Sequence, residues 1–140
     1  MSQSAIFDPV GVLAFWTFAV LLLIPFQRFR ASFAGKVTRD DFKYGESSNV
    51  PGHVSIPNRA MMNLLELPVL FYVVCLLFFV SASVTPLVMQ VAWIYVACRL
   101  IQTLIHLTYN NVIHRLTVFA VGNFVLVSLW VLFFFPAMTK

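Results

Sequence analysis

The stretch LPVLFYVVCLLFFVSASVTPLVMQVAWIYVAC, residues 67–98, decides the fold because it carries no charged side chain over 32 positions. A single helix of that length would extend about 48 Å, whereas the hydrocarbon core of a membrane is only about 30 Å thick. The small and polar segment SASVTP, residues 81–86, divides the run. The sequence therefore predicts two membrane-spanning helices here, over residues 57–81 and 86–109.

Two further apolar runs flank this stretch. Residues 9–27 carry no charge, and their 19 positions are enough to cross a membrane, so we predict a helix over residues 9–29. A turn signal at Asn110 and Asn111 precedes a last apolar run, predicted as a helix over residues 113–136. The pattern indicates an all-α membrane protein, a four-transmembrane-helix bundle forming a single domain over residues 1–140.

The composition excludes several classes of protein. Hydrophobic residues make up 61% of the chain and charged residues 10%, whereas a soluble domain has about 25% charged residues. A disordered chain and an ordinary soluble enzyme are therefore excluded. The basic residues cannot form an exposed face with stacking aromatics, so no nucleic-acid partner is expected. Cys75 and Cys98 lie inside apolar runs and predict buried thiols rather than a disulfide framework or a metal site.

One polar stretch, residues 31–56, predicts a long surface loop. Basic residues gather in it and beside it: Arg28, Arg30, Lys36, Arg39, Lys43 and Arg59. Positive charge accumulates on the cytoplasmic side of membrane proteins. We therefore expect the loop between the first two helices, and that between the last two, to be cytoplasmic. Both termini would then face outside, where Lys140 is the sole basic residue.

Two polar patterns interrupt the apolar helices at helical spacing, so each forms one stripe. They are Arg59, Asn63 and Glu66 in the second predicted helix, and Arg99, Gln102 and His106 in the third. A charged group in hydrocarbon costs roughly 2.5–3.5 kcal/mol on insertion scales, which makes such groups candidates for function. Glu66 and Arg99 fall at similar depth, so we expect them to form a buried ion pair that fixes the helix register.

Arg115 opens the fourth predicted helix. It is either an interfacial anchor for lipid phosphate or a cation that faces the two polar stripes. His106 is either a satisfied interior histidine or a functional group. Together these residues predict a polar pocket in the cytoplasmic half of the bundle, suited to a small, anionic, peptide-like molecule with grooves for an apolar one alongside.

Four motifs in this order resemble a known family, the membrane-associated proteins in eicosanoid and glutathione metabolism (MAPEG). They are Arg28-Phe29-Arg30, Arg59-x-x-x-Asn63-x-x-Glu66, Arg99, and Arg115-x-x-x-Phe119-x-x-Gly122. The resemblance covers about residues 10–135 and implies a four-helix bundle assembled as a homotrimer. It also implies glutathione as a co-substrate, bound between adjacent subunits on the cytoplasmic side.

The resemblance assigns a role to each matched position. The tripeptide would be held by Arg59, Asn63, Glu66 and Gln102, with Arg28 or Arg30 supplied by a neighbouring subunit. Arg115 would stabilise the thiolate, because a cation lowers the pKa of a thiol. The chain departs from the usual pattern at Met62, Gln102 and His106, where an arginine, a histidine and a tyrosine are common. His106 would replace the lost hydroxyl or act as a proton shuttle.

Three functions follow from this interpretation. The first is a glutathione-dependent membrane transferase or peroxidase acting on lipophilic electrophiles or lipid hydroperoxides. The second is a non-catalytic membrane lipid-binding scaffold of the same fold, which the altered pair Gln102 and His106 favours. The third is a small proton-coupled transporter, which a salt-bridged Glu66 disfavours because such a carboxylate is a poor proton carrier near neutral pH.

Overall fold

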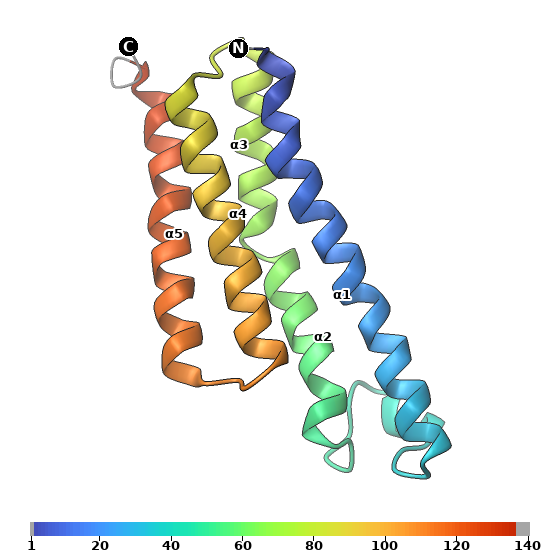
Figure 1. The fold of residues 1–140 in the computed structure, drawn as a ribbon. Helices are drawn as coiled ribbons and strands as arrows, with labels where there is room; N and C mark the ends of the chain where they lie inside the picture. Colours follow the sequence, from blue (N-terminus) through green and yellow to red (C-terminus); the bar gives the residue numbers. More distant parts are fainter. Residues whose placement is uncertain (1, 137–140) are drawn as a thin grey trace.

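The computed structural model describes residues 2–136, and within that range the chain is built from helices packed side by side (Figure 1). The elements are η1 (Gln3–Ile6), α1 (Phe7–Phe33), η2 (Arg39–Phe42), α2 (Gly52–Leu65), α3 (Pro68–Val80), α4 (Pro86–Leu107) and α5 (Val112–Phe134). Four segments are long and apolar enough to span a membrane: Gln3–Phe33, Gly52–Val80, Pro86–Leu107 and Val112–Phe134. The predicted fold class, a four-transmembrane-helix bundle, is confirmed.

The second span differs from the predicted helix over residues 57–81 because it consists of two helices. α2 begins at Gly52, and Pro57 lies inside it. α2 ends where Glu66 adopts φ −79° and ψ −99°, and α3 restarts with Pro68 in its first turn. Pro68 has no N–H to donate to the carbonyl of Leu64, four residues before it, so it cannot continue α2. Proline is, by contrast, favoured in the first turn of a helix. The break therefore follows from Pro68.

α1 is longer than its predicted range of 9–29. Its last turns include Arg28 and Arg30, so both side chains project from a helix rather than from a loop. The polar connection shortens to residues 34–51 and contains η2, whose first turn has a capping box between Thr38 and Asp41. At the α4–α5 turn, Asn110 is left-handed with φ 46°, a conformation that asparagine tolerates better than most residues.

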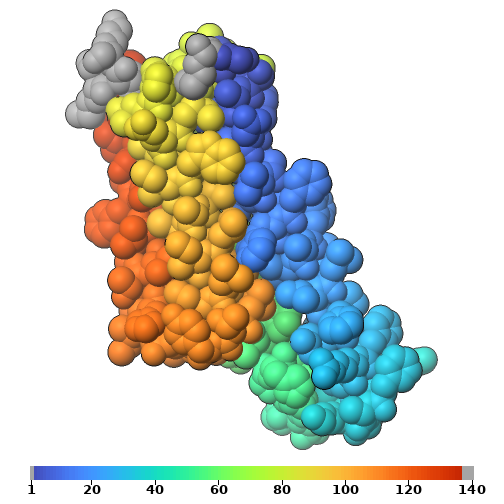
Figure 2. All heavy atoms as spheres, viewed as in Figure 1, coloured from blue at the N-terminus to red at the C-terminus, as the bar shows by residue number. Residues whose placement is uncertain are grey.

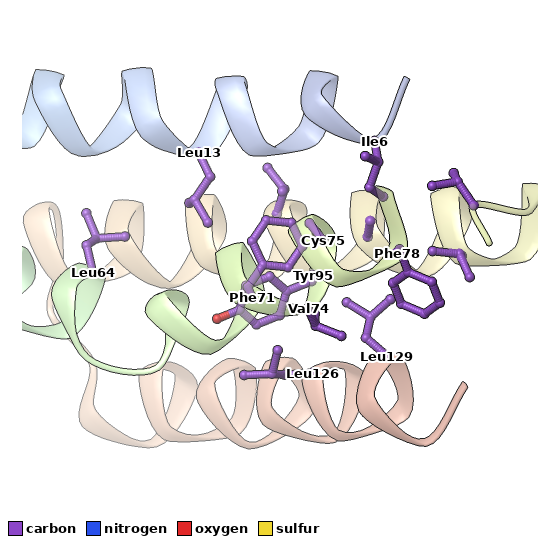
Figure 3. Close-up of a cluster of buried hydrophobic side chains, with 14 of the residues drawn as sticks. Ile6, Leu13, Leu64, Phe71, Val74, Cys75, Phe78, Tyr95, Leu126 and Leu129 are labelled. Carbon is purple, nitrogen blue, oxygen red and sulfur yellow. The ribbon is translucent and has the colours of Figure 1, made fainter. Parts of the chain in front are cut away.

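The core lies between α1, α3, α4 and α5 (Figure 3). Phe71 of α3 stacks on Tyr95 of α4 with ring centroids 4.6 Å apart, and Leu13 of α1 and Leu126 of α5 close the cluster. Many large apolar side chains remain on the outer surface, as expected where lipid rather than water surrounds the helices.

Both the start of α1 and the end of α5 lie at one end of the bundle (Figure 1). The other end, called the basic end below, carries residues 34–51 and the α4–α5 turn. In Figure 2 it forms a lobe, cyan and green, that projects past that turn. Its basic residues are Arg28, Arg30, Lys36, Arg39, Lys43, Arg59 and Arg115. Lys140 lies outside the described residues, and the orientation of the basic end towards the cytoplasm remains a prediction.

Candidate functional site

Arg99 is the central polar residue of the bundle interior and is only 1% exposed. Its Nε donates to the Tyr95 hydroxyl at 2.9 Å, its Nη1 to Gln102 Oε1 at 2.8 Å and its Nη2 to Asn123 Oδ1 at 2.8 Å. The rings of Tyr95 and Phe119 lie 5.0 and 5.3 Å from its Cζ. Neutral oxygens and ring faces therefore hold this cation in place.

The expected ion pair between Glu66 and Arg99 is wrong. Glu66 is exposed at the end of α2, and its carboxylate has no hydrogen bond or ion pair within residues 2–136. The one ion pair in that range joins Arg28 and Glu46 at 3.3 Å. The physical reason is the break before Pro68, since the helical stripe that would carry Glu66 inward ends there.

Sequence reasoning missed Asn123 as the partner of Arg99. The signal was present, because Asn123 is an uncharged polar residue in the middle of an otherwise apolar span and such residues usually face the bundle interior. It lies one residue after Gly122, where an added Cβ would approach Cys98 Cβ at 3.4 Å and Arg99 Nε at 4.0 Å. A small residue at position 122 thus suits the close packing of α4 and α5 at which Asn123 reaches the guanidinium.

A pocket of about 210 Å³ lies where α2, α4 and α5 meet. Its lining is Asn63, Gln102, Val112, Arg115, Leu116 and Phe119. Two amides and one guanidinium thus share a small space with apolar walls, because the helical stripes of α2 and α4 both face the first turns of α5. Three of the predicted site residues, Asn63, Gln102 and Arg115, are brought together here.

The α4–α5 turn fixes the Arg115 side chain. Its Nη1 donates to Asn110 Oδ1 at 2.7 Å. Asn110 is held in turn by its own backbone N–H, which donates to the Ile105 carbonyl at 2.7 Å. A left-handed asparagine therefore both closes α4 and orients the guanidinium, and nothing in the sequence pattern alone pointed to Asn110 in this role.

His106 lies directly behind this pocket and is 3% exposed. It lines a tightly packed space with Asn63, Arg99 and Gln102, and within residues 2–136 its ring has no hydrogen-bond partner. The imidazole is therefore next to the pocket, but the space around it is too tightly packed to hold a water molecule.

The remaining predicted residues lie outside this pocket within one chain. Arg59 is exposed and borders a separate cavity of about 570 Å³ between α2, the polar loop and Asn110. Arg28 bonds Glu46 and stacks over Phe42 at 4.5 Å. Arg30 lines a cavity of about 250 Å³ with Lys36 and His53, on a different face of α1 from Arg28. Glu66 faces outward.

The arrangement suits anion stabilisation beside an apolar surface. A guanidinium in a partly desolvated pocket favours a thiolate or another small anion. Amide side chains can donate to and accept from a peptide. The pocket is smaller than the roughly 300–1,000 Å³ of typical small-molecule sites, so one chain provides room for only part of a ligand.

The model of the MAPEG family matches residues 7–135. The chain belongs to the MAPEG family. No curated protein and no solved structure matches this MAPEG chain significantly. Its matched range includes every residue of the candidate site. Together with the four apolar spans, membership makes this MAPEG protein an integral multi-pass membrane protein in contact with lipid, and it supports, in general terms, a membrane function related to glutathione or eicosanoids.

Proposed function

We propose that this MAPEG protein is a glutathione-dependent membrane transferase or peroxidase. The observation that carries the proposal is the Arg115 guanidinium, fixed by Asn110 and facing the amides of Asn63 and Gln102 in one pocket. Arg115 would stabilise the glutathione thiolate, and the two amides would bind the peptide groups. The thiolate then attacks a lipophilic electrophile, forming a C–S bond as a leaving group such as halide departs. Alternatively it attacks the O–O bond of a lipid hydroperoxide, giving the alcohol and a glutathione sulfenic acid, which a second glutathione reduces to the disulfide and water.

An apolar substrate would approach from the lipid side. Leu116 and Phe119 border the pocket on α5, and Leu116 is exposed on the outer surface. A hydrophobic electrophile dissolved in the membrane can therefore reach the thiolate without crossing water. This geometry supports lipophilic substrates as a class.

A homotrimer would complete the site. The 210 Å³ pocket is too small for a whole tripeptide, and the remaining candidate groups, Arg59 and Glu66, point outward from α2. Arg30 is exposed and unpaired within residues 2–136, whereas Arg28 is tied to Glu46. Of the two arginines on α1, Arg30 is therefore better placed to contact glutathione on a neighbouring subunit.

The test is glutathione conjugation of an aryl halide by the purified protein, with Arg115→Ala compared with His114→Ala. Loss of one anion-stabilising donor costs on the order of 10²–10³ in kcat, so Arg115→Ala is expected to lower kcat by about that factor. His114 is exposed and bonds the Tyr109 hydroxyl, so its alanine variant controls for changes to the turn. Equal kcat values for wild type and Arg115→Ala contradict the proposal.

One observation favours a second candidate, a non-catalytic lipid-binding scaffold. Gln102 Oε1 is occupied by Arg99, and His106 is almost fully buried, so α4 presents few free polar groups to a ligand. A scaffold would retain lipid after purification, show no turnover and give no heat with millimolar glutathione in calorimetry. Measurable binding heat together with turnover supports the enzyme instead.

A further inference from the structure

A stripe of exposed apolar side chains runs along the outer face of α1 from Phe15 to its last residue, Phe33. Its members are Phe15, Phe18, Leu22, Phe26, Phe29 and Phe33. With about 100° of rotation per residue they fall within about 80° of arc, so they form one continuous surface. Phe33, the last residue of the helix, is 90% exposed.

The stripe ends in a pocket of about 320 Å³ at the basic end. Phe29 and Phe33 belong to both, and the pocket adds the guanidinium groups of Arg28 and Arg39 and the hydroxyl of Ser32. Its lining contains two cations and no carboxylate. Asp41, which is close in sequence, is engaged by Thr38 and Ser47 and does not line the pocket.

Two of these polar groups are free to bind an anion. Within residues 2–136 neither the Arg39 guanidinium nor the Ser32 hydroxyl has a hydrogen-bond or ion-pair partner. Arg28, by contrast, is held over the Phe42 ring and bonds Glu46. A phosphate between Arg39 and Ser32 would thus meet two unused donors, beside an Arg28 whose charge Glu46 already balances.

The depth of the pocket suits a lipid headgroup. The charge-free run of α1 ends at Gln27, so the following turn lies at the membrane interface, where aromatic and basic residues concentrate. An acyl chain lying against the stripe would therefore lead its own headgroup to Arg39. Because Arg39 is unpaired within residues 2–136 and the lining contains no carboxylate, the pocket favours an anionic headgroup over a zwitterionic one.

We propose that this pocket and the α1 stripe bind a phospholipid with an anionic headgroup. Its phosphate would lie between Arg39 and Ser32, with one acyl chain along the stripe. The site is separate from the proposed glutathione site because none of its residues lines the Arg115 pocket.

The experiment titrates the delipidated full-length protein in detergent with dioleoyl phosphatidylglycerol or dioleoyl phosphatidylcholine and counts bound lipid by native mass spectrometry. Phosphatidylglycerol should bind more tightly to the wild type. Arg39→Ala should weaken it by about fivefold. Ser32→Ala, which changes no charge, should weaken it on the order of two- to tenfold.

Lys36→Ala is the matched control, because Lys36 is a cation just beyond the same end of α1 but borders the cavity on its other side. It should weaken phosphatidylglycerol binding less than Arg39→Ala does. Equal effects of these two variants with no effect of Ser32→Ala would mean unspecific attraction to the basic end and would overturn the proposal. Equal binding of both lipids would also overturn it. So would a double variant, Phe29→Ser with Phe33→Ser, whose oligomeric mass changes while its lipid binding does not, because the stripe would then be a subunit interface.

Discussion

At the scale of single residues, a full charge is stabilised inside the bundle without a carboxylate. Arg99 donates hydrogen bonds to three neutral oxygens, and two aromatic rings lie within 5.3 Å of its Cζ. A guanidinium tolerates this because its charge is delocalised and its donors point in fixed directions. The interaction leaves α4 and α5 joined through one polar contact, Arg99 to Asn123.

Asn123→Leu is expected to destabilise the protein by about 1–3 kcal/mol, because it leaves one Arg99 donor without an acceptor in a buried site. Unfolding in mixed micelles of increasing SDS content, followed by circular dichroism, measures the change. Ser128→Ala is the control, since Ser128 bonds only the Phe124 carbonyl of its own helix. Equal stabilities of the two variants contradict the role given to Asn123.

His106→Phe is expected to lower glutathione-dependent turnover by about 10²-fold, as for loss of a general acid or base. Phenylalanine keeps an aromatic ring at this position, so the oligomeric mass should stay as in wild type. Turnover in detergent and native mass spectrometry give the two readouts. His53→Phe lies in a different cavity and serves as the comparison. Unchanged turnover in His106→Phe removes this residue from the mechanism.

At the scale of elements, the close contact between α4 and α5 depends on a small residue. Gly122→Leu is expected to cost about 1–3 kcal/mol, because a Cβ here would already contact Cys98 Cβ at 3.4 Å and the further atoms of leucine would overpack the interface. Gly122→Ala should be nearly neutral, since its Cβ would meet Cys98 Cβ at 3.4 Å, an ordinary contact. Gly11→Leu on α1, with no atom within 4 Å of an added Cβ, is the matched control in the same unfolding assay. A cost as large for Gly11→Leu contradicts this explanation.

Hydrogen bonds to the Asp41 carboxylate stabilise the polar loop in a pH-dependent way. The Thr38 backbone N–H donates to its carboxylate at 2.8 Å and the Ser47 hydroxyl at 2.7 Å, and these bonds hold the pKa of Asp41 below its ordinary value of 3.8. Because the folded pKa is lowered, the stabilisation is present above pH 3.8 and is lost as the pH falls through the folded value. Hydrogen exchange at residues 38–47 should therefore stay slow at neutral pH and speed up only below pH 3.8, after correction for intrinsic rates.

Asp41→Asn should remove most of that protection at neutral pH, whereas Asp40→Asn should leave it intact. Asp40 has no side-chain hydrogen bond within residues 2–136, which makes it a neighbour of the same charge without the same contacts. Equal exchange in the two variants would show that the Asp41 bonds do not hold the loop.

At the scale of the whole molecule, the proposed trimer predicts complementation between subunits. Arg30→Ala and Arg115→Ala should each be inactive if both arginines serve a site at a subunit boundary. Co-expressed at equal levels, they should regain about a quarter of wild-type turnover, because one boundary in four then pairs an intact Arg30 with an intact Arg115. Mixtures that stay inactive, together with a monomeric mass in native mass spectrometry, would contradict the shared site.

Hydropathy and the positions of helix-breaking residues in the sequence were enough to predict the architecture. Charge-free runs of about 20 residues must be helical in a membrane, because no other open structure satisfies the backbone there. The breaks at residues 81–86 and at Asn110 could therefore be predicted, as could the shared faces of Asn63, Gln102 and Arg115. Helix ends were predicted less well, since α2 begins five residues before its expected start and α1 continues through Arg30.

Only the tertiary structure decided which polar groups meet. Spacing along a helix tells which residues share a face, but not how far the helix is rotated about its axis or where it breaks. Spacing therefore predicted Glu66 as the partner of Arg99, whereas the partner is Asn123. The break before Pro68 turned Glu66 outward, and Gly122 allowed α5 to approach Arg99. The left-handed Asn110 in the α4–α5 turn oriented Arg115 of α5 through a side-chain hydrogen bond. The pairing of Arg99 with Asn123 depends on packing between distant segments, and the break and the turn depend on backbone geometry, neither of which helical periodicity encodes.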